Sequence, residues 1–427
     1  MSLLQRLSYA IGITTLTISA FSHAGDTYMC LPADIDGELT KQSEEHVRFA
    51  TFNAFLNRFN QGDLINDLQD PTQPQIAAVA EIIQRTRPDV LLLNEFDYDA
   101  AGIAVSLFQQ NYLSVGQNGQ QPIEYPYVFL AESNTGIPSG LDFNNDGITN
   151  GPDDAYGFGF FPGQFAMVLL SRHPIDERRA RTFQKFLWKD MPGALLPDDE
   201  LTPRPGDYYN KAELAVFRLS SKSHWDIPIW IHGKKVHVLA AHPTPPVFDG
   251  TEDRNGRRNH DEIRFWADYV GGHRKSRYIY DDEGKRGGLD HDDAFVILGD
   301  YNADPLDGDS TNSAILQLLE HPKINGGIAP ASIGGIEDST LEGQTNAGHI
   351  SNPALDTGDF NPADPGNLRV DYVLPSNHGI QPVCGGIFWP ATADTTRSLV
   401  GDGFPVVSSD HHLVWMDMKL TGHKHHY

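Results

Sequence analysis

The sequence predicts an α/β protein whose strands end in polar residues. Short apolar or alternating runs, typical of strands, recur between residues 47 and 420, and segments with helical spacing lie between some of them. The clearest run, residues 295–298, is Phe-Val-Ile-Leu; Gly299 ends it, and Asp300 and Asn302 follow. Residues two apart project from the same side of a strand, so this stretch places a carboxylate and an amide together at the rim of a sheet.

The first part of the chain predicts a strand, a helix and two further strands. Residues 47–53 alternate apolar and polar side chains and end at Asn53. A helix is expected over 75–86, where apolar side chains recur at helical spacing until Pro88 stops it. The next strands are expected over the residues 90–95, which end at Glu95, and 164–171.

The second part of the chain predicts more strands than helices, separated by long loops. The expected strands are 211–219, 236–242, 295–298, 369–374 and 413–420. The expected helices are short, at 263–270 and 312–319. Long inserted loops are expected at 99–165, 176–210, 248–292 and 306–368.

The N-terminal segment is typical of a secretory signal peptide. Arg6 precedes an apolar run over residues 7–21, and Ser-His-Ala at 22–24 has the small residues of a cleavage site, so we expect cleavage after Ala24. The apolar run is too short to span a membrane, and no later stretch reaches the roughly 20 apolar residues that a span needs. The mature protein, 25–427, is therefore expected to be soluble and exported to the periplasm or the medium.

The net charge limits the expected binding partners, and the cysteine content bears on a disulfide. The full chain carries a formal net charge of −25, which favours solubility and disfavours unassisted binding to nucleic acid or to an anionic membrane. The chain has two cysteines, Cys30 and Cys384. In an oxidising compartment a disulfide between them is the expectation, and two free buried thiols are the alternative.

The polar residues at the strand ends have two interpretations each. Asp300 and Asn302 could orient a water, hold a cation and bind a phosphate oxygen, as phosphoester chemistry requires. Glu95 closes an apolar strand and needs a partner, for which a cation is one candidate. Alone, Asp300 is equally typical of a hydrated turn, Glu95 of a salt-bridged rim residue, and His242 of a hydrogen-bonded one.

Residues 142–153 match the pattern of a twelve-residue calcium loop. Oxygen-bearing side chains occupy positions 1, 3, 5, 9 and 12, with glycine at position 6, although the last ligand is Asp instead of Glu. The loop resembles those of dockerins more than a sensor EF-hand. A structural Ca²⁺ is predicted here, and an Asx-rich surface turn is the alternative; the candidate ligands are Asp142, Asn144, Asp146, Ile148, Asn150 and Asp153.

Two basic stretches, 172–189 and 254–277, stand out in so acidic a chain. They suggest recognition of an anion, because guanidinium groups match phosphate oxygens in a bidentate way. Mutual neutralisation with the interleaved acids is the alternative. The second stretch lies just past His242, and it supplies the candidates for substrate contacts, which are Arg254, Asn255, Arg258 and Arg264.

Six motifs, each at a predicted strand end, resemble in their order those of the endonuclease/exonuclease/phosphatase superfamily, which has the DNase I-like fold. They are Thr51-Phe-Asn53, Asn94-Glu95, His242, Gly299-Asp300-Tyr-Asn302, Arg369-Val-Asp371-Tyr372 and Ser409-Asp410-His411. The resemblance covers about 47–420 and implies a four-layer sandwich of two mostly antiparallel sheets flanked by helices. Because the motifs must converge on one site, it also implies one domain over 25–427 with large loop insertions.

The resemblance implies a metal site. Glu95 would bind the divalent cation, which is Mg²⁺ or Mn²⁺ with Ca²⁺ as a further candidate. Asn53 and Asp410 would lie close to that cation.

The resemblance also implies catalytic roles. Asp300 and Asn302 would orient the attacking water and a phosphate oxygen. His411, held by Asp371, would act as a general base or as a charge on the phosphate. His242 would stabilise the developing negative charge or protonate the leaving group. In-line attack on a phosphoester requires each of these roles.

The sequence therefore predicts an exported, metal-dependent phosphoesterase. A phosphatase or phosphodiesterase acting on small esters suits the acidic chain best, and a secreted DNase- or RNase-type endonuclease is the alternative. A catalytically inactive, calcium-dependent binding protein on the same fold is a third possibility, for which loss of a strand-end residue would be expected. No membrane partner is expected, and the sequence leaves the oligomeric state open.

Overall fold

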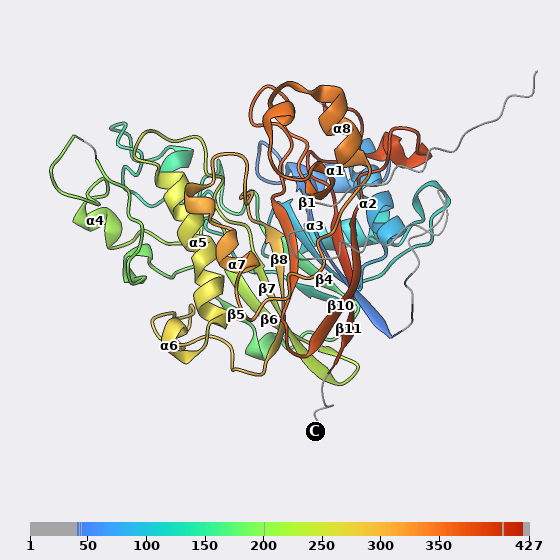
Figure 1. Cartoon of the computed structure of the whole chain (residues 1–427), viewed down its shortest axis with the longest axis horizontal. Helices are drawn as coiled ribbons and strands as arrows, with labels where there is room; N and C mark the ends of the chain where they lie inside the picture. Colours follow the sequence, from blue (N-terminus) through green and yellow to red (C-terminus); the bar gives the residue numbers. More distant parts are fainter. Residues whose placement is uncertain (1–40, 42, 44, 200, 404, 422–427) are drawn as a thin grey trace, which may run out of the picture.

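Two β-sheets face each other, and helices cover both outer faces (Figure 1). The structure is a computed structural model that describes residues 41, 43, 45–199, 201–403 and 405–421. The order of the strands is β10-β11-β1-β2-β4-β3 in one sheet and β5-β6-β7-β8-β9 in the other. The two sheets and their flanking helices form the predicted four-layer α/β sandwich.

The six-stranded sheet is built around β1. This strand pairs with β11 in an antiparallel and with β2 in a parallel arrangement, and the other neighbours in the sheet are antiparallel. The strands are β1 (His46–Leu56), β2 (Val90–Phe96), β3 (Tyr127–Phe129), β4 (Met167–Ser171), β10 (Ile380–Ile387) and β11 (Val414–Leu420).

The five-stranded sheet has the same mixture of directions. Its one parallel pair joins β7 and β8, and its other pairs are antiparallel. The strands are β5 (Arg181–Thr182), β6 (His224–Ile231), β7 (Lys234–Ala241), β8 (Ala294–Asp300) and β9 (Asp371–Pro375). Each parallel pair brings two carboxyl ends to the same edge of its sheet.

Alternate side chains of β7 and β8 face different layers. Val238 and Val296 belong to the apolar core that the two sheets share, whereas Leu239 and Ile297 pack in a second core with Trp266 of α5. The α-helices are α1 (Asp63–Gln69), α2 (Pro74–Thr86), α3 (Ile103–Phe108), α4 (Lys211–Leu214), α5 (Arg254–Val270), α6 (His273–Ser276), α7 (Leu316–Leu319) and α8 (Gly334–Glu342).

Several predicted elements differ from the structure. Residues 211–219 are not a strand: they begin with α4, because the Asn210 side chain accepts hydrogen bonds from the N–H groups of Ala212 and Glu213 and caps a helix. The helix predicted over 263–270 is α5, which starts at Arg254. The helix predicted over 312–319 is limited to α7 and a preceding 3₁₀ turn.

The predicted signal peptide and Cys30 lie outside the described residues. Cys384 is buried in β10. Cleavage after Ala24 and the Cys30–Cys384 disulfide therefore stay predictions. Within the described part of the chain, no helix combines the length and the apolar character that a membrane span requires.

Candidate active site

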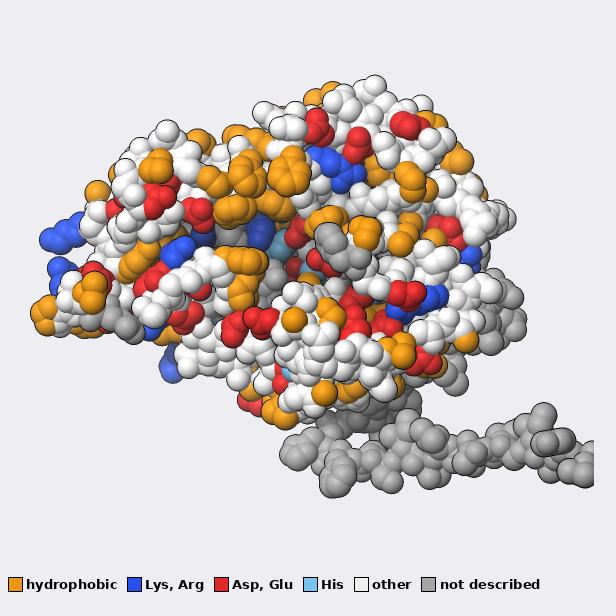
Figure 2. Space-filling model, turned by 90° about the horizontal axis from the view of Figure 1, so that it is seen from above, with side chains coloured by type: hydrophobic (Ala, Val, Ile, Leu, Met, Phe, Trp, Pro, Cys, Tyr) orange, Lys and Arg blue, Asp and Glu red, His pale blue; other side chains and the backbone are white. Residues whose placement is uncertain are grey.

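The polar strand-end residues meet in one cavity of about 630 Å³. Glu95, His242, Asp300, Asn302 and His411 all line it. Figure 2 looks into a hollow in which histidine, acidic and basic side chains lie between hydrophobic rims. The structure thus brings together residues that are more than 300 positions apart in the sequence, as the six motifs predicted.

Asp300 lies at the centre of this group. Its Oδ2 accepts a hydrogen bond from Asn53 Nδ2 at 3.1 Å and lies 3.4 Å from His242 Nε2 and 3.7 Å from His411 Nε2. Its Oδ1 accepts a hydrogen bond from the backbone N–H of Asn302 at 2.9 Å. Asp371, its neighbour across the β8–β9 pair, has a carboxylate oxygen within 4.8 Å of an Asp300 carboxylate oxygen, so one carboxylate contacts or approaches every other catalytic candidate.

The backbone before Asp300 explains why glycine precedes it. Gly299 has a φ of +154°, and a Cβ atom there would meet the carbonyl oxygen of Ala241 at 2.0 Å. A side chain at this position would push β8 away from the end of β7. Gly299 therefore lets the end of β8 lie against the strand that leads to His242.

Glu95 and Asn302 both adopt left-handed backbone conformations, with φ of +57° and +50°. Such conformations cost roughly 1–3 kcal/mol in residues other than glycine and are concentrated at functional sites. In Glu95 the conformation accompanies two side-chain contacts: Oε1 accepts from Asn53 Nδ2 at 3.1 Å and Oε2 from Asn57 Nδ2 at 2.7 Å. Asn57 was not predicted from the sequence.

Asp371 holds His411, as the family resemblance implied. Asp371 Oδ2 lies 2.8 Å from His411 Nδ1. Burial favours the neutral imidazole, but the carboxylates of Asp371 and Asp300 outweigh it and raise the pKa of His411 well above its usual value. His411 is therefore a cation at neutral pH in this structure.

His242 has the opposite charge state. Burial and the nearby ammonium group of Lys222 lower its pKa well below the usual value, so the ring is neutral. Its Nε2 faces Asp300, and its Nδ1 has no hydrogen-bond partner among the described residues. The two histidines of the site therefore differ in protonation because only one of them has a carboxylate at both ring nitrogens.

The donor set fits a divalent cation. Burial and the charge of Asp410 raise the pKa of Glu95 to about 7, and burial raises that of Asp300 to about 6, which is the electrostatic signature of acids that lack a counter-ion. Asp371 Oδ1 is buried without a hydrogen-bond partner in the described structure. Carboxylate and amide oxygens are also the donors that Mg²⁺, Mn²⁺ and Ca²⁺ prefer.

Two candidate ligand sets lie next to each other. The predicted set is Glu95, Asn53 and Asp410, and the side chain of Asn53 links it to Asp300. A second set consists of Asp300, Asp371 and His411, whose candidate ligand atoms all lie within 4.8 Å of one another. Asp410 is partly exposed and raises the pKa of Glu95, so its carboxylate lies on the Glu95 side.

Three of the four predicted substrate contacts line the cavity. They are Arg254, Asn255 and Arg258, at the N-terminal end of α5. Arg264 was predicted wrongly: it lies two turns further along α5, where its guanidinium donates to the carbonyl oxygens of Pro192 and Gly193. A helix turns about 100° per residue, so a contiguous basic stretch cannot place all its members on one face.

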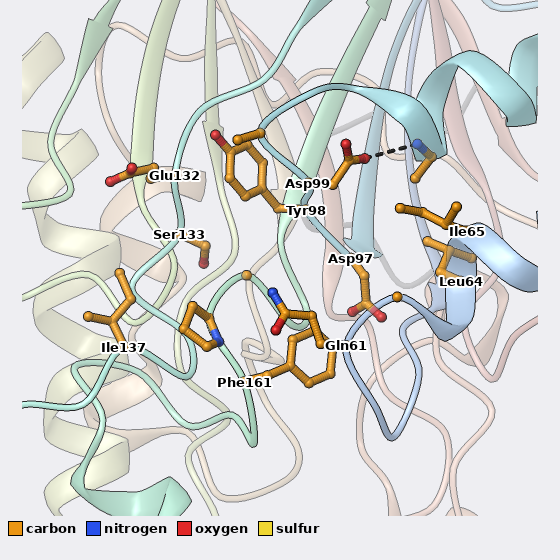
Figure 3. Close-up of a pocket in the computed structure, with 15 residues that line it drawn as sticks. Gln61, Leu64, Ile65, Asp97, Tyr98, Asp99, Glu132, Ser133, Ile137 and Phe161 are labelled. Atoms are coloured by element: carbon orange, nitrogen blue, oxygen red, sulfur yellow. Dashed lines mark hydrogen bonds between the residues drawn. The ribbon is translucent and has the colours of Figure 1, made fainter.

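A second pocket, of about 370 Å³, lies beside Asp97 and Asp99 (Figure 3). Two of its three acids, Asp97 and Asp99, accept hydrogen bonds from the backbone. Asp97 accepts hydrogen bonds from the backbone N–H groups of Arg58 and Phe165, and Asp99 accepts from those of Ile103 and Ala104 at the start of α3. These two carboxylates hold loops in place, and the candidate catalytic residues line the larger cavity instead.

The raised pKa values predict how pH affects the metal-free protein. Unfolded carboxyl groups titrate near ~4, whereas the pKa of Glu95 is raised to about 7 and that of Asp300 to about 6. At pH values between the unfolded and the folded pKa of each acid, the folded state holds protons that the unfolded state has lost. The free energy of unfolding therefore falls as pH rises through this range. A cation that binds the ionised acids reverses this loss.

Calorimetry with and without Mg²⁺ checks the prediction. We expect Mg²⁺ to raise the melting temperature by several degrees near about pH 7.5 and much less near about pH 5, where the acids are protonated. Equal shifts at both pH values would contradict it. Asn53→Ala removes a ligand without removing a charge and is expected to weaken the Mg²⁺ effect at the higher pH.

Comparison with known proteins agrees with the fold and the arrangement of motifs. The model of the Endonuclease/Exonuclease/phosphatase family matches residues 50–411. None of the curated proteins compared with the chain matches it.

Similar solved structures share the fold at low identity. An endonuclease/exonuclease/phosphatase from Beutenbergia cavernae has 16% identity and a TM-score of 0.43 over 88% of this chain and 72% of that one. A Staphylococcus aureus beta toxin variant with bound magnesium ions has 15% identity and a TM-score of 0.44 over 87% and 99%. The human Nocturnin catalytic domain with bound sulfate has 12% identity and a TM-score of 0.41 over 89% of this chain and 98% of that one. The chain belongs to the endonuclease/exonuclease/phosphatase family, whose members hydrolyse phosphoester bonds.

Proposed function

We propose that this protein is a divalent-metal-dependent hydrolase of small phosphoesters. The arrangement of Asp300 carries the proposal: a single buried carboxylate lies between Asn53, a neutral His242 and a cationic His411 that Asp371 holds. In-line attack on phosphorus needs an oriented water, a stabilised phosphoryl charge and fixed donors, and these groups supply each of them.

The roles follow from the charge states. Asp300 orients the attacking water and accepts its proton, for which a pKa of about 6 is suitable near neutral pH. His411 places a positive charge on a phosphoryl oxygen, and the neutral His242 donates a hydrogen bond. Glu95, Asn53 and Asp410 would hold the cation, which when bound acts as a Lewis acid on the phosphoryl group.

Pairing of the arginines favours a small substrate over a nucleic acid. A duplex would need a run of unpaired cations to neutralise its phosphates. Most arginines of the two basic stretches instead form ion pairs. In the second stretch the partners are acids within it or just before it, as the neutralisation alternative predicted, whereas Arg172 and Arg181 pair with acids outside both stretches. The pairs are Arg172 with Asp89, Arg179 with Asp176, Arg181 with Asp281, Arg254 with Glu252, Arg257 with Asp253 and Arg264 with Asp268.

The walls of the cavity also favour a small ester with an apolar or aromatic group. Inserted loops line it on several sides, and they contribute rings as well as polar side chains. Phe248 is 86% exposed at the cavity, and Phe158 is 48% exposed. Such side chains gain free energy by covering an apolar leaving group. The aromatic lining consists of Phe143, Phe158, Phe165, Tyr209, Phe217 and Phe248.

The test is a paired assay on the metal-stripped protein, with Mg²⁺, Mn²⁺ or Ca²⁺ added back. The substrates are p-nitrophenyl phosphate, bis-p-nitrophenyl phosphate and plasmid DNA. We expect metal-restored hydrolysis of a small ester whose rate changes little with salt. Rapid plasmid nicking that weakens steeply with salt would instead establish the nuclease alternative. No hydrolysis with any metal would remove the proposal.

The loop at 142–153 is proposed as a structural Ca²⁺ site. Asp142 accepts hydrogen bonds from the backbone N–H groups of Asp146 and Gly147, and Asp146 accepts from that of Ile148, so the carboxylates turn inward. Asp153 lines the active-site cavity, and the neighbouring Asp154 bonds the loop backbone. The site would brace the loop that carries part of the cavity wall.

Melting scans test this loop. We expect Ca²⁺ to raise the melting temperature by several degrees in the wild type and not in Asp142→Ala, because bound ligand stabilises the folded state by mass action. Asp292→Ala, which changes an exposed acid elsewhere, serves as the control. A wild type that does not respond to Ca²⁺ or to chelator would contradict the site.

We also propose that the protein is exported. The leader predicted at 1–24 and the two cysteines support a periplasmic or extracellular enzyme. Mass spectrometry of the protein recovered outside the cytoplasm, with and without reductant, tests both the cleavage after Ala24 and the disulfide. A retained leader or two free thiols would contradict them.

A further inference from the structure

Lys222 is a buried cation in the wall of the active-site cavity. It lies in the short segment before β6 and is 7% exposed. It lines the same cavity as His242 and Asp300. Neither the family motifs nor the roles proposed above use it.

The ammonium group of Lys222 has no direct partner in the described structure. It forms no ion pair with a described carboxylate and donates no hydrogen bond to a described residue. Burying an ammonium group without a partner is costly, and proteins avoid it outside functional sites. The active-site cavity therefore forms the surroundings of the ammonium group.

Neutralisation of the Glu262 carboxylate does not explain why Lys222 is buried at this position. Glu262 is the largest source of negative potential at Lys222. However, both of its carboxylate oxygens accept backbone hydrogen bonds, from Ser221 at 2.7 Å and from Thr244 at 2.6 Å. Those bonds satisfy the buried carboxylate, and a lysine kept to neutralise it would form an ion pair with it.

Lys222 acts electrostatically on the reacting groups. Its charge is the largest contribution after burial to the lowered pKa of His242. Glu95 and Asp300 in turn act on Lys222. The cation, the two acids and the neutral histidine line one cavity, which is where an anionic phosphoryl group would bind.

We propose that Lys222 is a catalytic residue whose ammonium group binds a non-bridging oxygen of the phosphoryl group under attack. The proposal rests on the proposed hydrolysis of phosphoesters at this site. Negative charge spreads over the non-bridging oxygens in the transition state, and a preorganised cation in a dry site stabilises that charge more than water does. The same contact would bind the phosphate group of the product, for which inorganic phosphate serves as the probe.

Lys222→Met tests the contact. We expect kcat/KM to fall by ~10²–10³-fold, as for the loss of one preorganised donor at a developing charge. We also expect the inhibition constant of inorganic phosphate to rise at least ~10-fold. The melting temperature is expected to stay equal or to rise, because the substitution removes a buried charge without a partner. Lys285→Met, at an exposed lysine outside both basic stretches and outside the cavity, is the matched control.

Lys222→Arg separates a contact from a structural role. It keeps the positive charge beside Glu262 but moves it, so a purely structural role predicts wild-type kcat/KM and phosphate inhibition. The proposed contact predicts a loss of kcat/KM of ~10-fold or more at an unchanged melting temperature, because a planar guanidinium cannot take the place of a compact ammonium group. This variant decides the question if Lys222→Met does not fold.

A phosphate-induced rise in melting temperature separates this inference from the proposed function, because it needs no turnover. We expect inorganic phosphate to stabilise the wild type with its metal and not the Met variant. If the wild type hydrolyses no ester but shows this Lys222-dependent shift, only the proposed function fails. If the wild type hydrolyses esters and both lysine variants keep its kinetics and phosphate affinity, only the role of Lys222 fails.

Discussion

Replacing Asp300 by asparagine is expected to lower kcat by ~10³-fold or more at an unchanged or slightly higher melting temperature. The amide is isosteric with the carboxylate but cannot take a proton from water, and water activation with charge stabilisation supplies several powers of ten. Asp300 is buried, and both burial and the charge of Asp371 raise its pKa. Removing its charge therefore relieves the fold while disabling the site.

The measurement is a kinetic comparison on a small phosphoester at saturating metal, with melting scans of each protein. Asp292→Asn is the matched control, since the Asp292 side chain is 80% exposed and lies outside the cavity. It is expected to keep the wild-type kcat. A wild-type rate in Asp300→Asn would remove Asp300 from the catalytic centre.

Replacing Asp371 by asparagine is expected to shift the alkaline limb of the kcat/KM profile to lower pH. His411 acts in its protonated form, so activity is present below its pKa and is lost as pH rises through it. Burial lowers that pKa, and Asp371 is the largest of the causes that raise it. Without Asp371 the imidazole loses its proton nearer neutrality, and the rate near about pH 8 is expected to fall ~10²-fold.

The pH profiles of the wild type, Asp371→Asn and His411→Gln identify the group. We expect the limb at high pH in the wild type, at lower pH in Asp371→Asn, and no such limb in the weakly active His411→Gln. An unshifted limb in Asp371→Asn would show that the limb reports another group. A second check is non-additivity: residues that act as a unit lose little more in the double variant than in either single one.

The sequence predicted that the polar strand-end residues come together, because the signal for a strand end is local. A polar residue directly after an apolar strand marks a sheet edge, and the parallel pairs β1 with β2 and β7 with β8 bring such edges together. Asn53, Glu95, His242 and Asp300 are all found this way. Lys222 carries no such mark, because it lies among polar loop residues whose position depends on tertiary packing. Asn57 directly follows β1 and was missed because the predicted strand ended at Asn53, three residues before the end of β1.

The elements that prediction missed contain polar residues, prolines or glycines. In β6, Trp225, Ile227, Ile229 and Ile231 alternate as in a strand, but Pro228 interrupts the run, and a proline argues against a strand. In β10, a proline and two glycines hide an eight-residue strand. The N-terminal half of α5 is polar yet buried: Asn259 and Glu262 bond the backbone of loops far away in sequence.

For a different reason, a strand was predicted where the structure has α4. Its apolar residues alternate, which is a strand pattern, but Asn210 and Glu213 form a capping box that starts a helix. The Asn-x-x-Glu spacing was visible in the sequence. Terminal hydrogen bonds outweighed the alternation because the segment is too short to gain much from one buried face.

The pairing of β1 with β11 has a consequence for how the chain folds. Arg48 in β1 and Asp417 in β11 are fully buried and joined by two hydrogen bonds, of 2.7 and 2.8 Å. Until the ribosome has released β11, β1 lacks one of its two neighbours and Arg48 its counter-ion. Sheets closed by such distant segments form late and slowly. The sheet is therefore completed only once β11 is available, and until then the apolar β1 and β2 are exposed to aggregation.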